Sequence, residues 1–376
     1  MPTAVDHRTL LRASVADFIA RGTSMARVRR MRDEAREHDA ATWRQMAELG
    51  WLAIVIPEAA GGLGLGLAEA TIVAEGLGRA LVPEPYTASV LAAEALARSD
   101  NVALRAELLS EIAGGRLIAA LAWQEEAGAL ALENMKTRAT RFEGGFRLTG
   151  TKRYVAAAAA ANGYLIAACT EAQRTVLCWV TPEAPGLRLE LEALADGRHF
   201  GTLHLDDVSV APTQIAASEE VAAAALERAL DRATVVASAE LYGVMSRALE
   251  LTLDYLRTRV QFGTPIGSFQ ALQHRAVDLY IQRELASAVL EQTTAAMDQE
   301  PQPNTRTRLA SRAKARCADA ASKITRAAIQ LHGAIGFTDE YDAGLYLKRA
   351  LVLGAWLGNA TWHRRRYAAL ASEGRA

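Results

Sequence analysis

The sequence predicts an α+β chain, mainly α-helical, in which a unit of β-strands lies between two α-helical units. The spacing of apolar residues changes from helical repeats to alternation near residue 117 and returns to helical repeats near residue 220. The 376 residues, 51% of them hydrophobic and 23% charged, suffice for two or three packed units. We therefore expect an N-terminal α-helical domain over residues 1–116, a central antiparallel β domain over 117–219 and a C-terminal helical bundle over 220–376.

The N-terminal domain begins with a helical stripe of apolar side chains, at Leu11, Val15, Phe18 and Ile19. Helical spacing recurs over residues 43–56, 67–81 and 87–109. The glycine-rich segment 61–66 follows Pro57, lacks the GxGxxG spacing of a dinucleotide-binding loop and has no βαβ pattern around it. We interpret it as a loop between helices.

Short apolar or alternating runs bounded by Gly or Pro predict the strands of the central domain. They cover residues 117–123, 146–155, 164–168, 175–180 and 202–205. The three cysteines Cys169, Cys178 and Cys317 form no CxxC pair and lie in apolar surroundings. This pattern favours buried thiols in a reducing compartment over disulfides or zinc ligands.

The C-terminal domain is predicted to contain three long helices, over residues 221–259, 268–297 and 305–332. Ser268 is a candidate N-cap for the second helix, and Gly333 is a candidate for the position just past the end of the third. Long helices in series indicate an antiparallel bundle.

Composition also argues against several classes of function. A formal net charge of -1 disfavours nucleic acid as a partner, and the seven histidines include no HxxxH or HExxH pair that would indicate a metal site. No apolar run approaches the roughly 18 residues of a membrane span. The N-terminus lacks the pattern of a signal peptide, so we expect a cytoplasmic protein.

Two glycine-containing turns follow long helices and carry polar side chains suited to an anionic cofactor. The first is RTRVQFGTPIGSFQ at residues 257–270, and the second is QLHGAIGFT at residues 330–338. Together they supply the candidate binding residues Arg259, Gln261, Phe262, Gln270, Gln330 and Gly333. The simpler interpretations are a surface cation at Arg259 and a helix C-cap at Gly333.

Nearly the full length of the chain resembles the acyl-CoA dehydrogenase family. The resemblance rests on the order and spacing of LGWLAIVIPEAAGGLG, LTGTKRYV, VTPEAPGL, LHLDDVSVAP, RVQFGTPIGSFQ and QLHGAIGFTDEY. The phrases RALVPEPYTASVL, GSFQALQHRAVD and EYDAGLYLKRA are most similar to the small subunit of pimeloyl-CoA dehydrogenase-type enzymes. That branch acts on dicarboxylic or otherwise unusual acyl-CoA thioesters.

The resemblance implies FAD held between the β domain and a C-terminal four-helix bundle. It further implies removal of the proton α to the thioester carbonyl by a carboxylate, and hydride transfer from the β carbon to the flavin. Electrons would pass to an electron-transfer flavoprotein. The apolar faces of the bundle favour a dimer or tetramer.

The resemblance also gives each candidate residue a role. Arg259, in register with Gln261, would bind the FAD pyrophosphate, and Phe262 with Gln270 would flank the nucleotide. The second turn, at Gln330 and Gly333, would contact the adenosine half of a FAD bound mainly by a neighbouring subunit. Tyr154 would cover the flavin, although ordinary sheet packing explains a tyrosine there equally well.

The catalytic positions depart from the family pattern. Leu357 stands where most members carry the glutamate base, and Ala233 stands where a minority carries it. Asp231 and Glu240 are the nearby carboxylates and remain candidate bases. Neither inherits the role by alignment, and a helix-surface acid at Asp231 or a buried ion pair at Glu240 is the simpler interpretation.

The segment that would face the flavin, residues 123–130, is shorter than in the family and lacks the hydroxyl side chain expected near the flavin. Ala156 stands where the family carries a second hydroxyl side chain. Two hypotheses follow. The chain is an FAD-dependent acyl-CoA dehydrogenase with an unassigned carboxylate base, or it is a catalytically incomplete subunit. In the second case Arg259 and Gln330 complete the FAD site of a sister chain in a heterotetramer with a homologous large subunit. Flavin oxidase or monooxygenase chemistry on the same fold is a further interpretation.

Overall fold

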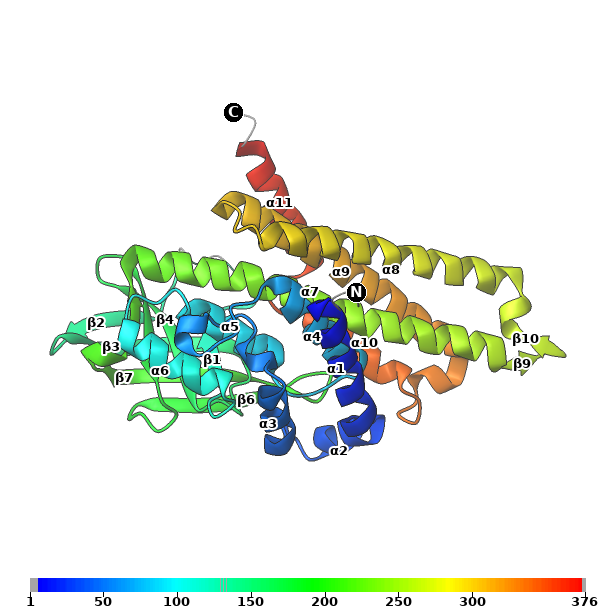
Figure 1. The fold of residues 1–376 in the computed structure, drawn as a ribbon, viewed down its shortest axis with the longest axis horizontal. Helices are drawn as coiled ribbons and strands as arrows, with labels where there is room; N and C mark the ends of the chain where they lie inside the picture. The colour runs from blue at the N-terminus through cyan, green and yellow to red at the C-terminus, as the bar shows by residue number, and fades with distance from the viewer. Residues whose placement is uncertain (1–5, 129, 131, 133, 374–376) are drawn as a thin grey trace, which may run out of the picture. The chain divides into compact units, whose positions relative to one another are not determined.

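A computed structural model describes residues 6–128, 130, 132 and 134–373. Six α-helices of the described chain precede the sheet, and their bounds are α1 His7–Gly22, α2 Met25–Asp33, α3 Ala40–Glu48, α4 Leu67–Arg79, α5 Tyr86–Leu96 and α6 Val102–Ala113 (Figure 1). The stripe predicted on the first helix buries Val15 and Phe18. Between α3 and α4 the chain forms two short 3-10 helices, η1 Trp51–Ala53 and η2 Glu58–Ala60, followed by the expected loop over residues 61–66.

The helical stretch predicted over residues 87–109 is interrupted. Helix α5 ends at Leu96, and α6 begins after Asn101, whose side-chain oxygen accepts a hydrogen bond from Leu104 N at 3.1 Å. An asparagine at this position caps a new helix because its short side chain reaches the free N–H groups of the first turn. The apolar spacing alone did not reveal the break.

Eight strands of the described chain form one mixed sheet. Their bounds are β1 Ala119–Ala122, β2 Arg138–Phe142, β3 Gly145–Ala156, β4 Gly163–Thr170, β5 Thr175–Val180, β6 Leu187–Ala193, β7 His199–Val210 and β8 Ile215–Ser218. The order is β6-β7-β3-β2-β4-β5-β8, with β1 paired to β4. Most neighbours are antiparallel as expected, but β4 pairs in parallel with both β1 and β2.

Three strands, β2, β6 and β8, were not predicted. Strands β2 and β6 are mostly exposed, so their sequences RATRF and LRLELEA lack a continuous apolar signal. The other strands bury their side chains in a core that includes Tyr164, Cys178 and Leu203. All three cysteines are free and buried, which confirms the expectation of buried thiols.

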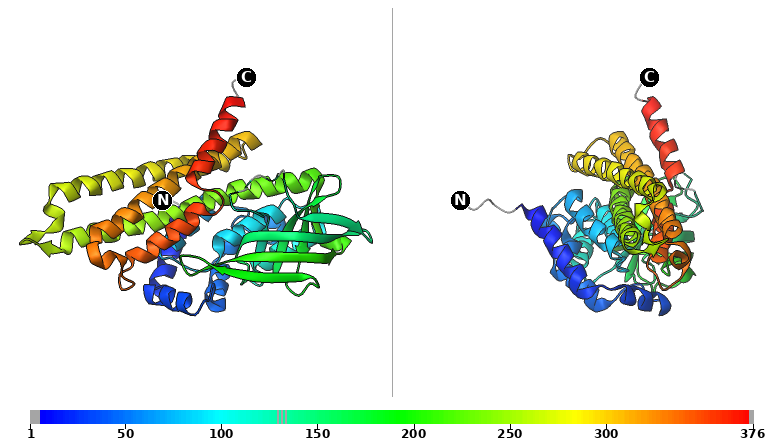
Figure 2. Two further views of the ribbon diagram at one scale, coloured as in Figure 1. Left: turned by 180° about the vertical axis from the view of Figure 1, so that it is seen from behind. Right: turned by 90° about the vertical axis from the view of Figure 1, so that its right-hand side faces the viewer.

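Long helices dominate the C-terminal part, with bounds α7 Glu219–Thr258, α8 Gln270–Met297, α9 Pro303–His332, α10 Ala343–Ala355 and α11 Ala360–Glu373. The views show α8 and α9 running side by side, and α9 also packs against α10 and α11 (Figures 1 and 2). The three predicted long helices are confirmed. Gly333 lies at the C-cap of α9 with φ of 67°, also as predicted.

The predicted N-cap role of Ser268 is wrong. Helix α8 begins one residue later than expected for that cap, with Phe269 in the capping position and no side-chain capping bond. Ser268 Oγ instead donates to the Pro265 carbonyl oxygen at 2.7 Å, within the preceding 3-10 turn. The hydroxyl therefore stabilises the turn and not the helix end.

The internal contacts of the chain fall into two compact units. The first comprises the chain up to Arg30, Leu67–Val82 and the chain from Thr234 onward, and the second comprises Met31–Gly66 and Pro83–Ala233. The division into domains 1–116, 117–219 and 220–376 stays a prediction. In the described residues, none of the helices has both the length and the apolar content to cross a membrane.

Candidate functional site

The first predicted cofactor segment forms a β-hairpin in the first unit. Strand β9, Val260–Gln261, pairs with β10, Thr264–Pro265, and the turn is made by Phe262 and Gly263 at φ of 55° and 79°. A hydrogen bond from Ile266 N to the Arg259 carbonyl oxygen, at 2.8 Å, closes the base of the hairpin. The hairpin therefore carries Arg259, Gln261 and Phe262 on one short segment, and their cofactor-binding roles stay predictions.

These side chains face away from the protein core. Phe262 is 94% exposed, and its ring meets the edge of Phe269, with ring centroids 6.2 Å apart. Gln261 and Gln270, the first residue of α8, are also exposed. Val260 and Phe269 are exposed as well, so the hairpin presents a small apolar surface to solvent.

Arg259 is the residue expected to bind the FAD pyrophosphate, and its surroundings show whether it could do so. Its guanidinium makes no hydrogen bond or ion pair with any residue in the described part of the chain, so all its side-chain donors remain available. A Cβ built on Gly263, in the turn of the same hairpin, would meet nothing within 4 Å, so the backbone of the turn is open. Free planar donors beside open backbone fit phosphate oxygens.

The second predicted segment lies at the end of α9. The His332 ring is 4.5 Å from that of Tyr255 on α7, and its Nε2 lies 3.1 Å from Tyr341 Oη. Its Nδ1 lies 2.7 Å from a carbonyl oxygen one turn earlier, and burial lowers the pKa of His332. The neutral ring thus ties the end of α9 to the part of α7 that leads into the hairpin. Gln330 is exposed here, and the positive φ of Gly333 is one that favours glycine.

Tyr154 occupies an irregular position in the second unit. The pairing of β3 with β7 shifts register between Lys152 and Val155, and Tyr154 within this bulge has φ of 57°. The half-buried ring packs edge-on against Phe200, with centroids 6.4 Å apart, and the Arg153 guanidinium lies 5.2 Å from its centre. Bulges that redirect a side chain often lie beside functional sites. The flavin-covering role of Tyr154 stays a prediction.

A buried ion pair stabilises the neighbouring segment. Glu125 accepts hydrogen bonds from Lys136 N at 2.6 Å, Thr137 N at 2.9 Å and Lys152 Nζ at 2.6 Å. Lys152 is fully buried and also donates to the Trp123 carbonyl oxygen at 3.2 Å. Burial lowers the pKa of Lys152 to about 8, against the opposing effect of the Glu125 charge. Burial alone would raise the pKa of Glu125, but the Lys152 charge and these hydrogen bonds lower it overall.

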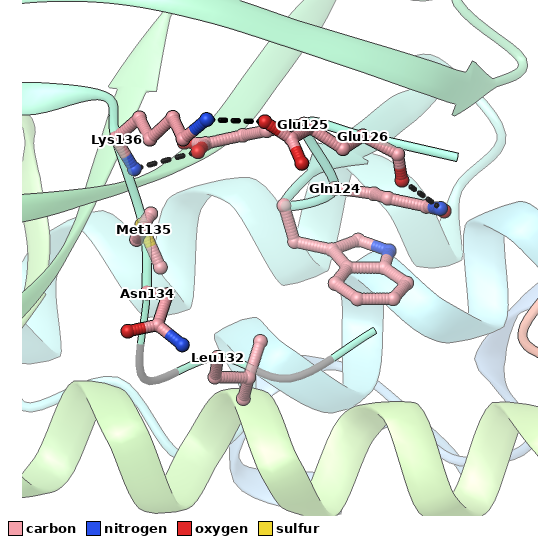
Figure 3. A pocket seen from close by; sticks show the side chains of 8 residues that line it. Gln124, Glu125, Glu126, Leu132, Asn134, Met135 and Lys136 are labelled. Carbon is pink, nitrogen blue, oxygen red and sulfur yellow. Dashed lines mark hydrogen bonds and ion pairs between the residues drawn. The ribbon is translucent and has the colours of Figure 1, made fainter. Parts of the chain in front are cut away.

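These residues border a cavity of about 200 Å³ lined by Trp123–Glu126, Leu132 and Asn134–Lys136. Figure 3 shows Glu125 and Glu126 on the side nearest Lys136, joined to it by hydrogen bonds and an ion pair. Residue 129 of the predicted flavin-facing segment lies outside the described residues. Lys152 lies in the LTGTKRYV motif, and its ion pair with Glu125 is not predictable from the sequence because no local pattern shows that a lysine is buried.

Leu357, which the resemblance places where most members carry their base, lies in the turn between α10 and α11. Leu357 is buried, with φ of 58°, and Gly358 follows at 102°. The Leu357 carbonyl oxygen lies 2.9 Å from His363 Nε2, and Ser311 Oγ lies 3.3 Å from Nδ1 of the same ring. Burial, with a contribution from the Lys314 charge, lowers the pKa of His363 to about 3. The ring is therefore neutral, and Nε2–H donates to the turn.

Lys314 holds the same turn from α9. This fully buried lysine donates from Nζ to the carbonyl oxygens of Leu353 at 2.9 Å, Gly358 at 3.1 Å and Trp356. Burial lowers the pKa of Lys314 to about 7, and three carbonyl acceptors favour its charged form. Sequence reasoning missed this residue. A single lysine among the alanines of ASRAKARCADAA was the available signal.

Glu240 is nearly buried on α7 in the first unit. Arg349 on α10 donates to Glu240 Oε1 from Nε at 3.0 Å and from Nη2 at 2.6 Å. The backbone of Glu240 lies against Gly78 of α4, where any Cβ would collide with the Glu240 carbonyl oxygen. The side chain therefore has the geometry of a structural ion pair, which was the simpler of the two interpretations in the sequence.

Asp231 is fully buried on the part of α7 that belongs to the second unit, and it is not free of partners. Two arginines on the same helix, Arg228 and Arg232, pair with the buried Glu94 of α5, with Arg232 Nε at 2.6 Å from Glu94 Oε1. Ala233 is also buried. Nothing in this cluster tests whether Asp231 acts as a base, so its role stays a prediction.

The described part of the chain contains no group of three or more His, Cys, Asp or Glu side chains placed to hold a metal ion.

Comparison with known proteins gives consistent matches along the chain. Residues 6–116 match the model of the acyl-CoA dehydrogenase N-terminal domain, and residues 221–371 match that of the C-terminal domain. Acyl-CoA dehydrogenase IpdE2 from Mycobacterium tuberculosis is 33% identical over 352 residues, covering 93% of this chain and 92% of the relative.

Two solved structures are similar over nearly the whole chain. One is described as a variant of the Tcur3481-Tcur3483 steroid ACAD, with 30% identity, a TM-score of 0.88 and coverage of 98% of each chain. The other is the ChsE4-ChsE5 complex from Mycobacterium tuberculosis, with 27% identity, a TM-score of 0.89 and coverage of 99% of this chain and 98% of that one. The domain matches and the similarity to IpdE2 show that the chain belongs to the acyl-CoA dehydrogenase family.

Proposed function

We propose that this chain is a subunit of an FAD-dependent acyl-CoA dehydrogenase in which a homologous partner chain supplies the catalytic base. One observation carries the proposal. The α10–α11 turn, which by resemblance should present a glutamate, carries the buried apolar side chain of Leu357. Lys314 and His363 fix the backbone of this turn through its carbonyl oxygens. An aliphatic side chain cannot accept a proton, so the turn has a structural role here.

The candidate carboxylates on α7 do not readily replace the missing base. Proton abstraction requires a carboxylate that reaches the substrate and is free to gain a proton. Glu240 is held by two hydrogen bonds from Arg349, so its Oε1 is already occupied by a buried partner. Asp231 is fully buried. A self-sufficient enzyme would need one of these side chains to exchange its partners for substrate.

The chain retains residues suited to binding FAD. Arg259 would bind the pyrophosphate through its free guanidinium, with Phe262 and Gln270 beside the nucleotide. Gln330 and Gly333 would approach the adenosine half of a FAD shared with the partner. When bound, FAD supplies the acceptor for the hydride that leaves the β carbon of the substrate. This chain would contribute a positive charge that binds the pyrophosphate and side chains that position the nucleotide.

Similar solved structures support a two-chain assembly. The descriptions of these two structures each join two protein names, Tcur3481 with Tcur3483 and ChsE4 with ChsE5. We infer the same kind of assembly for this chain, as a heterotetramer with a homologous large subunit. The substrate would be an acyl-CoA thioester of the dicarboxylic or otherwise unusual class, with an electron-transfer flavoprotein as the electron acceptor.

The experiment is reconstitution with a homologue from the same organism that carries Glu at the position of Leu357. The chain is purified alone and co-purified with that homologue, and flavin content and anaerobic bleaching by a panel of acyl-CoAs are measured. We expect bleaching only in the mixed complex, and we expect its loss when the homologue's Glu is changed to Gln. Bleaching by the chain alone that disappears in the Asp231→Asn or Glu240→Gln variant would instead establish a self-sufficient dehydrogenase.

A further inference from the structure

A second hollow lies within the first unit, on the helices α1 and α4. This groove has a volume of about 480 Å³, within the range of roughly 300–1,000 Å³ typical of small-molecule sites. Its apolar wall comes from Val15 and Ile19 on α1 and Ile72 on α4. The charged part of the lining consists of three arginines, one of them on α7, and the carboxylate of Glu75. The packing of α1 against α4 can be followed in Figure 1.

Small residues create the hollow. At the helix crossing, Gly76 of α4 lies against Val15, whose side chain any Cβ on Gly76 would strike, so the two helices approach closely there. Beside the crossing, Ala16 and Ala20 on α1 leave space that larger side chains would fill. The groove is therefore built into a tight helix contact and does not depend on a loop.

Charge is unevenly distributed along the groove. Arg79 Nη2 lies 2.8 Å from both carboxylate oxygens of Glu250, and Arg247 Nη1 lies 3.3 Å from Oε2 of the same group. Two guanidinium groups thus share one carboxylate. Arg12 and Glu75, 3.6 Å apart, form a second pair, and the Glu75 carboxylate also interacts electrostatically with Arg79. Three guanidinium groups thus face two carboxylates, which leaves one positive charge in excess along the groove.

We propose that this groove binds a small apolar molecule carrying a single carboxylate. The carboxylate would contact Arg247 and Arg79, completing the charge balance with Glu250, and the apolar body would lie along Val15, Ile19 and Ile72. A carboxylate suits this position because guanidinium groups bind it through paired N–H donors. A cationic molecule with the same apolar body would meet like charge. The proposal goes beyond acyl-CoA dehydrogenation and does not depend on it.

The test uses decanoate as the probe and isothermal titration calorimetry on the full chain, without turnover. We expect one decanoate to bind per chain, with decan-1-ol at least about tenfold weaker because it lacks the charge-assisted hydrogen bonds. Decylamine should not bind. Equal binding of all three probes would show nonspecific hydrophobic adsorption and overturn the proposal, as would no decanoate binding at all.

Matched variants locate the site. Ala16→Leu fills the hollow and should weaken decanoate binding at least about tenfold, whereas Ala13→Leu on an exposed position of the same helix should leave it unchanged. Arg247→Gln should weaken it about three- to tenfold, and the exposed Arg257→Gln should not. All four variants should keep the helical circular dichroism of the parent. Wild-type affinity in folded Ala16→Leu would place the bound decanoate elsewhere and contradict the assignment.

Discussion

Replacement of Lys314 by Met should destabilise the α10–α11 turn, because Lys314 Nζ donates to three carbonyl oxygens around it. A hydrogen bond from a charged donor contributes about 1.5–3 kcal/mol, so three contribute about 5–9 kcal/mol before costs. Burying an ammonium group costs several kcal/mol, which methionine avoids at similar volume. We therefore expect a net loss of about 2–4 kcal/mol in the free energy of unfolding.

The assay is the denaturant midpoint together with hydrogen exchange of peptides covering residues 343–373. Lys314→Met should lower the midpoint and speed exchange in this region, because three carbonyl oxygens lose their donor. The control is Lys323→Met, an exposed lysine on the same helix, which should change stability by less than about 0.5 kcal/mol. Equal midpoints and exchange rates for the two variants would refute the structural role assigned to Lys314.

Three further predictions concern ion pairs and the hairpin. Glu240→Gln should lower the free energy of unfolding by about 3–5 kcal/mol, because its arginine partner stays buried without a counter-charge. The control is Glu227→Gln at an exposed position of the same helix. A variant that keeps its stability and loses only turnover would favour catalysis by Glu240. Because the folded pKa of Lys152, about 8, lies below the unfolded value near 10.4, the folded state binds fewer protons between these pH values. Stability should thus rise from pH 8 to pH 10 relative to Lys152→Met, and parallel melting curves would contradict this. Arg259→Gln should weaken FAD binding in the mixed complex about tenfold or more, measured by flavin retention, whereas Arg257→Gln should retain it.

Much of the fold was predictable because helical periodicity is a local property. The long helices α7, α8 and α9 carry apolar stripes that persist over many turns, and Gly333 marked the end of α9. Strands β2 and β6 escaped because their side chains are mostly exposed, so no apolar pattern distinguishes them from loops. The parallel pairing of β4 depends on where distant segments meet, which local sequence does not record.

The turn of the first cofactor segment was predictable because glycine constrains the backbone there. Gly263 and the flanking residues define a tight hairpin turn, while the binding roles of Arg259 and Phe262 stay predictions. The buried cations Lys152 and Lys314 were not recognised, because burial of a lysine depends on partners far away in the sequence. Their roles follow only from three-dimensional contacts.

The central claim is that this chain lacks its own base, and α-proton exchange tests it most directly. Acyl-CoA substrates are incubated in D₂O with the flavin-loaded chain alone or with the mixed complex, and the α-carbon signal is followed by NMR. This readout reports proton abstraction separately from hydride transfer. We predict deuterium incorporation by the mixed complex and none above background by the chain alone. Exchange catalysed by the chain alone would contradict the account.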